Sequence, residues 1–457
     1  MPVQAAQDGV KKELFETMPI PQAVSRMCVP MVITSLVTVV YNMADTYFVG
    51  LLGDPVQSAA VTLAYPVVLA FNALNNLFGV GSSSLVSRSL GQGDLEQARN
   101  AAAFGFWGAL LGGLLYSLAC TVFRTPLLGV LGADATTVQA TTQYMYWVVT
   151  WGAAPTILNV VQGQLVRSEG CSVHAGIGTM SGCILNIILD PIFILPWGLN
   201  MGAAGAGLAT FLSNCAACLY FIVLARIKGR GTVISMDVRR LFHMPPAVMK
   251  NVLAVGVPAA IQNLLNVVGN TLLNNFAAAY GAVVVAAMGV STRLIQISQQ
   301  ISMGIAQGAM PLISYNYASR NYRRMKGVIR FDMLVDVAVL TAMTAAYWVF
   351  AGPLVNLFQN NAEVVAYGSI FLRGACLAIP FLAVDFSCVF TFQSVGMGRI
   401  TLLLAVCRKL LLEIPLLFAL NWLFPLYGLP YAQPVTEVVL TILGLVFLRR
   451  LLRERGV

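Results

Sequence analysis

The sequence is poor in charge: charged residues make up only 10% of its 457 residues, whereas hydrophobic residues make up 58%. Soluble domains carry about 25% charged residues. A chain with so little charge cannot keep a surface in contact with water, so the composition excludes a string of soluble domains. The apolar residues form long runs instead, and about 20 residues are enough to cross a bilayer core of about 30 Å. The sequence therefore predicts an integral membrane protein.

Histidine is nearly absent, and the two that occur, His174 and His243, are isolated. The nine cysteines lie mostly in apolar runs and lack the spacing of a metal site. There is no HExxH or paired-histidine cluster, which argues against a membrane-embedded enzyme. We therefore expect no catalytic residues, no resident metal and no cofactor. The polar N-terminus has no cleavable signal pattern, so the first span is expected to serve as its own insertion signal.

Hydropathy predicts an all-α membrane protein of about twelve transmembrane helices, because lipid cannot satisfy the open edge of a sheet. The spans are expected at 26–51, 57–84, 100–123, 138–162, 174–195, 201–225, 251–278, 283–311, 328–351, 364–394, 400–424 and 428–448.

Lysine and arginine alternate from loop to loop. They gather in the N-terminal segment, after the even-numbered spans and in the tail, whereas the opposite loops contain only Arg124. Basic loops stay in the cytoplasm. We therefore expect a multi-pass protein of the plasma or inner membrane with both termini cytoplasmic. The net charge of +9 is then a topology signal, and no nucleic-acid partner is expected.

The two halves of the chain repeat. The first begins its repeat with VPMVITSLVTVVYNMADTYFVGLLG and the second with VPAAIQNLLNVVGNTLLNNFAAAYG, in which Pro30 and Pro258 are 228 residues apart. Six spans are an even number, so both copies have the same orientation. This predicts two parallel six-helix lobes related by a pseudo-two-fold axis along the membrane normal. The lobes are expected at 1–228 and 251–457, joined by a cytoplasmic linker at 229–250.

Both lobes carry a polar stripe at helical spacing. The first span has Thr38, Asn42 and Asp45 on one face, and the repeat places Asn266 and Asn270 on the matching face. A cavity lined by these stripes is one interpretation. Hydrogen bonding between helices is the other, because small polar side chains commonly do this in membranes.

Asp45 has no carboxylate counterpart in the second lobe, where the repeat places Leu273. A charged residue within a span costs at least about 2.5 kcal/mol and is usually partnered. The fifth span offers Asn186 and Asp190, one turn apart. Both acids are expected in the outer half of the membrane, where they could share one ion or proton. A purely structural pair of buried acids is the alternative.

The second lobe has charges of both signs, which predicts internal pairing: Arg293, Asp336, Arg373, Asp385, Glu413 and Glu437. Of these, Arg293 and Asp385 are also candidates to line a cavity. Arg408 and Lys409 are expected near the cytoplasmic end of the eleventh span, with their charged ends reaching the surface.

Five motifs follow one another along the chain: NMADTYFVGLLG, SLGQGDLEQAR, LVRSEGCS, LNIILDPIFI with GAAGAGLAT, and QGAMPLISYNYASRNYRR. In these motifs, and over nearly its whole length, the chain resembles the multidrug and toxic compound extrusion (MATE) family. The resemblance implies an antiporter, in which Na⁺ or H⁺ influx drives the export of amphipathic or cationic compounds. It implies a monomer in the lipid bilayer, with the transported ion in place of a cofactor.

The resemblance carries a cation site over to the first lobe: Asp45, Asn186, Asp190 and Thr210, with Asn159 or Gln162 as further contributors. It also associates Pro30 with a helix kink that moves, although a plain structural kink is an equal reading. Family members with a second-lobe cation site carry acids in spans seven and eight, whereas this chain has none in span seven and Arg293 in span eight. First-lobe coupling is therefore expected.

One rival function is a flippase for a lipid-linked saccharide on the same broader fold. Such a protein needs a cavity rich in cations to hold a pyrophosphate, and Arg293 and Arg373 are the only deep basic residues expected. A channel is disfavoured, because a repeated two-lobe body with one asymmetric pair of acids suits alternating access better.

Overall fold

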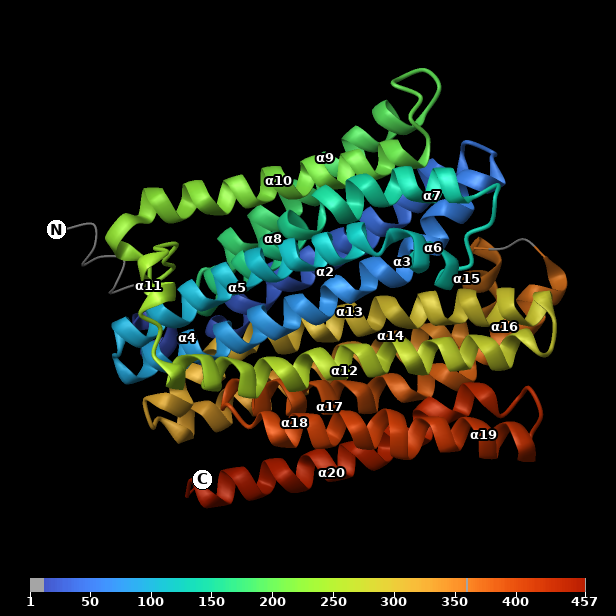
Figure 1. The fold of residues 1–457 in the computed structure, drawn as a ribbon. Helices are drawn as coiled ribbons and strands as arrows, with labels where there is room; N and C mark the ends of the chain where they lie inside the picture. Colours follow the sequence, from blue (N-terminus) through green and yellow to red (C-terminus); the bar gives the residue numbers. More distant parts are fainter. Residues whose placement is uncertain (1–11, 359–360, 457) are drawn as a thin grey trace. The chain divides into compact units, whose positions relative to one another are not determined.

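The computed structural model describes residues 12–358 and 361–456, and the regular secondary structure of these residues is entirely helical. Figure 1 shows the long helices that make up the fold. Each of the twelve predicted spans coincides with a helix, or with a run of helical segments, in the described part of the chain. The predicted all-α membrane fold is therefore confirmed.

Up to the central linker, the elements are η1 (Glu13–Thr17), α2 (Ile20–Gly50), α3 (Pro55–Asn75), η2 (Asn76–Val80), α4 (Gly81–Gln92), α5 (Leu95–Val122), α6 (Arg124–Val130), α7 (Val138–Met145), η3 (Tyr146–Trp151), α8 (Ala153–Ser168), α9 (Ser172–Ile194), α10 (Ala203–Lys228), η4 (Gly229–Gly231) and α11 (Arg239–Phe242). Beyond it, they are α12 (Pro246–Ala278), α13 (Ala282–Ala318), α14 (Tyr322–Val349), α15 (Ala351–Phe358), α16 (Ala362–Ala375), η5 (Cys376–Ala378), α17 (Ile379–Ser394), α18 (Gly398–Val406), η6 (Cys407–Glu413), α19 (Ile414–Leu423), η7 (Leu429–Tyr431) and α20 (Ala432–Glu454).

Several spans are not continuous α-helices. The fourth is α7, η3 and α8 in succession, and the eleventh is α18, η6 and α19, where η3 and η6 are π-helical. Of the described helices, seven are long and apolar enough to cross a membrane by length and composition alone, and eight if α14 and α15, bent by 81°, form one span. Local π-helical segments are frequent at functional sites, which directs attention to η6.

The chain divides into two compact units. Unit 1 comprises the described residues up to Thr17 and Ile33–Ala260, and unit 2 comprises Met18–Val32 and the described residues from Ile261 onward. Both boundaries therefore lie inside long helices, α2 and α12. Each follows two residues after an internal proline, Pro30 in α2 and Pro258 in α12.

The helix packing of unit 1 recurs in unit 2. In unit 1, α8 packs against α5, α9 and α10. In unit 2, α17 packs against α14, α18 and α20, which are the corresponding helices of the repeat. The fourth helix of each half is therefore its central helix, and the repeat read from the sequence is present in the packing.

The turn before the third span also recurs. Gly93 has φ 75° and is followed by Asp94, whose side chain accepts a hydrogen bond at 2.9 Å from a backbone N–H of α5. In unit 2, Arg320 has φ 61° and Asn321 caps α14 at 3.2 Å in the same way. Left-handed backbone disfavours a side chain. The second copy therefore keeps the turn even though arginine has taken the glycine's place.

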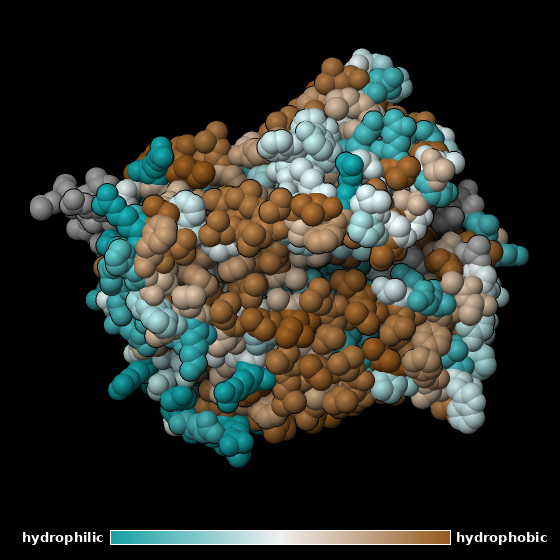
Figure 2. All heavy atoms as spheres, in the orientation of Figure 1, coloured by the Kyte–Doolittle hydropathy of each residue, from teal (hydrophilic) through white to brown (hydrophobic). Residues whose placement is uncertain are grey.

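Hydrophobic side chains cover the sides of the helices, and hydrophilic side chains gather at the ends, as the face in Figure 2 shows. Large apolar side chains such as Leu115, Leu334 and Trp422 are exposed on helices. In water such a surface would drive aggregation. In lipid it is the surface that a spanning protein needs.

Candidate functional site

Two carboxylates lie together in unit 1. Asp190, on α9, is fully buried, and Asp45, on α2, is half-buried. The two are close enough to repel one another electrostatically, and Tyr41 lies near both. Among the described residues, Asp190 Oδ1 has no hydrogen-bond partner. The structure thus brings together the two acids that the sequence paired.

A network of polar side chains connects to Asp190. When the amide of Asn186 is oriented to satisfy its neighbours, its nitrogen donates to Asp190 Oδ2 at 2.8 Å. Its oxygen then accepts from the Thr210 hydroxyl at 3.3 Å and from the Thr210 backbone N–H at 3.1 Å. Behind Thr210, Asn214 donates to the Thr210 carbonyl at 2.8 Å and accepts from Asn159 at 3.1 Å. Helices α8, α9 and α10 therefore share one network.

Gln162 is buried one turn after Asn159 on α8, and its amide oxygen and nitrogen both lack hydrogen-bond partners. Buried amides normally have partners. Together with Asp190 Oδ1, they leave unused polar atoms in unit 1. Carboxylate, amide and hydroxyl oxygens are ligands for hard cations, and carboxylates also accept protons, so this arrangement can hold either.

The other residues of the first-span stripe lie differently. Thr38 donates to the Thr34 carbonyl of its own helix at 2.9 Å and lies 3.9 Å from Cys183 Sγ. Asn42 is exposed. In the described residues, neither side chain is hydrogen-bonded to the two acids.

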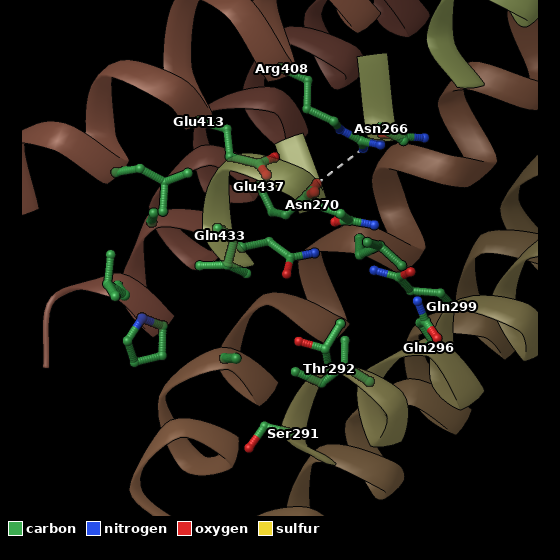
Figure 3. Close-up of a pocket in the computed structure, with 18 of the residues that line it drawn as sticks. Asn266, Asn270, Ser291, Thr292, Gln296, Gln299, Arg408, Glu413, Gln433 and Glu437 are labelled. Carbon is green, nitrogen blue, oxygen red and sulfur yellow. Dashed lines mark hydrogen bonds and ion pairs between the residues drawn. The ribbon is translucent and has the colours of Figure 1, made fainter. Parts of the chain in front are cut away.

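Unit 2 contains a pocket of about 130 Å³, shown in Figure 3. Asn266 and Asn270 of the second stripe line it. Asp385 is buried outside the pocket lining, and Arg293 is exposed and also does not line it. Arg373, a further charge noted in the sequence, is exposed too, and its Nε donates to the Trp348 carbonyl at 3.1 Å.

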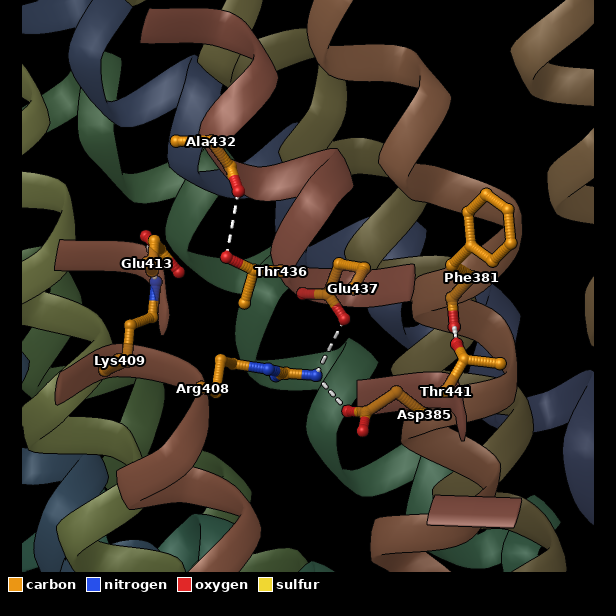
Figure 4. A network of polar contacts seen from close by, with 9 residues as sticks. All are labelled: Phe381, Asp385, Arg408, Lys409, Glu413, Ala432, Thr436, Glu437 and Thr441. Carbon is orange, nitrogen blue, oxygen red and sulfur yellow. Dashed lines mark hydrogen bonds and ion pairs between the residues drawn. The ribbon is translucent and has the colours of Figure 1, made fainter. Parts of the chain in front are cut away.

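Arg408 and Lys409 lie in η6 and are buried, so the expectation that they reach the cytoplasmic surface was wrong. Arg408 donates to Asp385, and it lies 3.1 Å from Glu437. Lys409 Nζ lies 2.7 Å from Glu413 Oε1. Figure 4 shows both pairings. The predicted internal pairing of second-lobe acids is confirmed for these three, but their partners are the two residues assigned to the surface.

The error lay in the depth assigned to these two residues, because the span was expected from 400 and the helix begins at Gly398. The eleventh span starts at Gly398, so Arg408 is ten residues, or about 15 Å, along it. A basic side chain that deep cannot reach water and needs acids nearby. The spacing of Lys409 and Glu413, four residues apart on one helix, was a signal for the pairing.

One buried acid inside a predicted span escaped the sequence analysis. Asp332, one turn before Asp336 on α14, is 2% exposed. Ser302 donates to Asp336 at 2.6 Å, and Ser387 donates to Asp332 at 3.4 Å. These two acids are held by hydroxyl groups and form no salt bridge within the described residues.

Comparison with known proteins bears on all of these features. The MatE family profile matches the chain twice, at residues 30–192 and 258–419. The two matches start 258 − 30 = 228 residues apart, which is the offset of the repeat.

Whole-length relatives agree. The chain is 31% identical over 445 residues to the multidrug export protein MepA of Staphylococcus saprophyticus, covering 96% of each chain. It is 32% identical, with the same coverage, to MepA of Staphylococcus haemolyticus. Its structure matches a crystal structure of MATE in complex with MaL6 with a TM-score of 0.91, at 25% identity over 98% of this chain and 99% of that one. With both halves matching the profile and the whole length matching these relatives, the chain belongs to the multidrug and toxic compound extrusion family of membrane transporters.

Proposed function

We propose that this protein exports amphipathic or cationic compounds by antiport, driven by the influx of H⁺ or Na⁺. The relatives at about 30% identity are multidrug export proteins, which supports multidrug export by this chain. The observation that carries the coupling is the buried Asp190, which interacts electrostatically with Asp45 and, among the described residues, has one carboxylate oxygen without a hydrogen-bond partner and no salt bridge.

Two ionised carboxylates in a site with little water repel one another, and that repulsion is relieved by a proton or a bound cation. Asn186 and Thr210 position Asp190 through the hydrogen bonds described above. Asn159 and Gln162 extend the set of polar atoms on α8. We assign to this site the binding and release of the coupling ion. Thr38 and Asn42 stay candidates to line a transport cavity.

Transport by alternating access requires a change between two states, and a helix that bends is one way to make it. In α2, Pro30 has no backbone N–H to donate, and the unit boundary falls two residues later. We assign the movable kink to this point. The alternation of basic loops supports cytoplasmic termini in a cytoplasmic membrane, and we propose that the protein acts as a monomer.

The flippase alternative gains no support. A pyrophosphate needs cationic side chains that are free to bind it. Among the basic residues inside the spans, Arg408 and Lys409 are held by three carboxylates. Arg293 and Arg373 are exposed, and neither lines the pocket of unit 2.

The test is export of a fluorescent cationic dye by purified protein in liposomes, under an imposed H⁺ or Na⁺ gradient. Wild type should export under one gradient, which names the ion. Asp190→Asn and Asp45→Asn should lose gradient-driven export. The matched control is Asp94→Asn, a carboxylate-to-amide change at an exposed helix cap that asparagine also makes well. Export at the wild-type rate by Asp190→Asn would refute the coupling role.

A further inference from the structure

The pocket in unit 2 is lined by side-chain amides. Asn266 and Asn270 lie on α12, Gln296 and Gln299 on α13, and Gln433 on α20, and Figure 3 shows them around the space. An amide offers both a donor and an acceptor. At about 130 Å³, the pocket is close to the roughly 150 Å³ of a cavity known to hold benzene. It can therefore take one small organic group.

One ion pair forms part of the pocket wall. Lys409 and Glu413 line it, are 8% and 7% exposed, and lie 2.7 Å apart. Among the described residues, Glu413 Oε2 is buried without a hydrogen-bond partner. One oxygen of this carboxylate is thus unused beside the pocket.

Gly269 makes room for the pair. A Cβ on this glycine would lie 3.0 Å from Lys409 Nζ and 3.2 Å from Glu413 Oε1. The repeat aligns Gly269 with Tyr41, since 269 − 228 = 41, and Tyr41 lies near the acids of unit 1. The second lobe therefore has a glycine where the first has a tyrosine, and the ion pair at the pocket wall occupies the space that a side chain would fill.

The charges favour a cation as occupant. Five ionisable side chains interact here: Asp385, Arg408, Lys409, Glu413 and Glu437. Three acids against two bases leave one negative charge. Arg408 is fixed between two acids and stacks 5.6 Å from the Phe386 ring, whereas Lys409 has Glu413 as its salt-bridge partner and a flexible side chain.

We propose that this pocket binds a small organic ammonium group, which takes the place of the Lys409 ammonium at Glu413. Lys409 is then a tethered competitor that neutralises Glu413 when the pocket holds no ligand. The amides accept the remaining N–H groups, and the pocket encloses the apolar body. As a substrate subsite, the pocket rests on the export function proposed above, although binding itself does not require transport.

The test is calorimetric titration of the full-length protein in detergent with benzylammonium, with benzyl alcohol and benzoate as neutral and anionic matches. Wild type should bind benzylammonium in preference to both. Lys409→Met removes the competitor and should tighten benzylammonium binding by about tenfold or more, because Glu413 is then left without its cation. Glu413→Gln should abolish the preference over benzyl alcohol.

The control is Arg450→Met, which breaks a pair of the same spacing, Arg450 with Glu454 at 2.9 Å, on the exposed side of α20. It should leave binding unchanged. The double variant Lys409→Met/Glu413→Gln carries no unpaired charge at this position, so it guards against misfolding, and it should bind benzyl alcohol and benzylammonium equally.

Tighter binding of benzoate than of benzylammonium would overturn the proposal, and so would unchanged or weaker benzylammonium binding by Lys409→Met. No gradient is present in this experiment. If wild type bound these ligands as expected but exported no dye under either gradient, the antiport function would be refuted and the binding site would stand.

Discussion

Replacing Arg408 with methionine tests how unit 2 tolerates its buried charges. The change keeps a long flexible side chain but leaves Asp385 and Glu437, each with a side chain that is 1% exposed, without their cation. Breaking a buried ion pair by removing one partner costs about 3–5 kcal/mol. One kcal/mol lowers the melting temperature of a domain of about 150–250 residues by about 2–4 °C, so we expect a loss of about 6–20 °C.

The assay is thermal unfolding of the purified protein in detergent, with all variants heated at one rate because such transitions are often irreversible. The triple variant Arg408→Met/Asp385→Asn/Glu437→Gln removes all three of these charges and should recover most of the loss, because a buried neutral amide costs far less than a buried carboxylate that has lost its cation. Arg450→Met breaks an exposed pair and should change the melting temperature by less than about 4 °C, since exposed pairs are worth about 0–1 kcal/mol.

Two results would refute this reasoning. If Arg408→Met had the same melting temperature as wild type, water would have to reach the two acids. A triple variant that melts no higher than the single variant would mean that Arg408 acts through its packing on Phe386 and not through its charge.

Two further predictions concern unit 1. Gly256→Ala places a Cβ 1.9 Å from the Leu77 carbonyl oxygen and should destabilise the protein by about 1–3 kcal/mol. The control Gly50→Ala, whose Cβ would have nothing within 4 Å, should have the melting temperature of wild type. Glu169→Ala removes the acceptor that holds the Thr232 hydroxyl at 2.7 Å, so trypsin should cut the linker at 229–250 faster than in wild type. Equal cutting rates would show that Glu169 does not hold the linker.

The twelve helices could be predicted from the sequence because each needs only a long enough apolar run, and lipid allows no other regular structure there. The interruptions could not. Segment η3 is as apolar as its neighbours, and the charges of η6, Arg408, Lys409 and Glu413, do not by themselves require π spacing, which depends on what packs against the helix.

The candidate coupling site could be predicted in part. Asp45 and Asp190 were paired from their depth in two helices, and Asn186 from its spacing. Asn214 and Tyr41 were missed, because an amide or a phenol in a span costs little and gives no sequence signal until a neighbour is known. Depth was also the source of the error at Arg408. Ten residues, or about 15 Å, into its span, an arginine is too deep to reach water and needs acids nearby.

The two lobes illustrate how one repeated helix framework can support different chemistry. At two positions one turn apart, the first lobe has Tyr41 and Asp45 where the second has Gly269 and Leu273. The first lobe keeps two acids near each other without a fixed cation, which leaves room for an ion that comes and goes. The second lobe holds Asp385, Glu413 and Glu437 against Arg408 and Lys409, cations that cannot leave. On the functions proposed above, an ion gradient acts on the first site directly, whereas the second site responds to a molecule able to displace a tethered side chain.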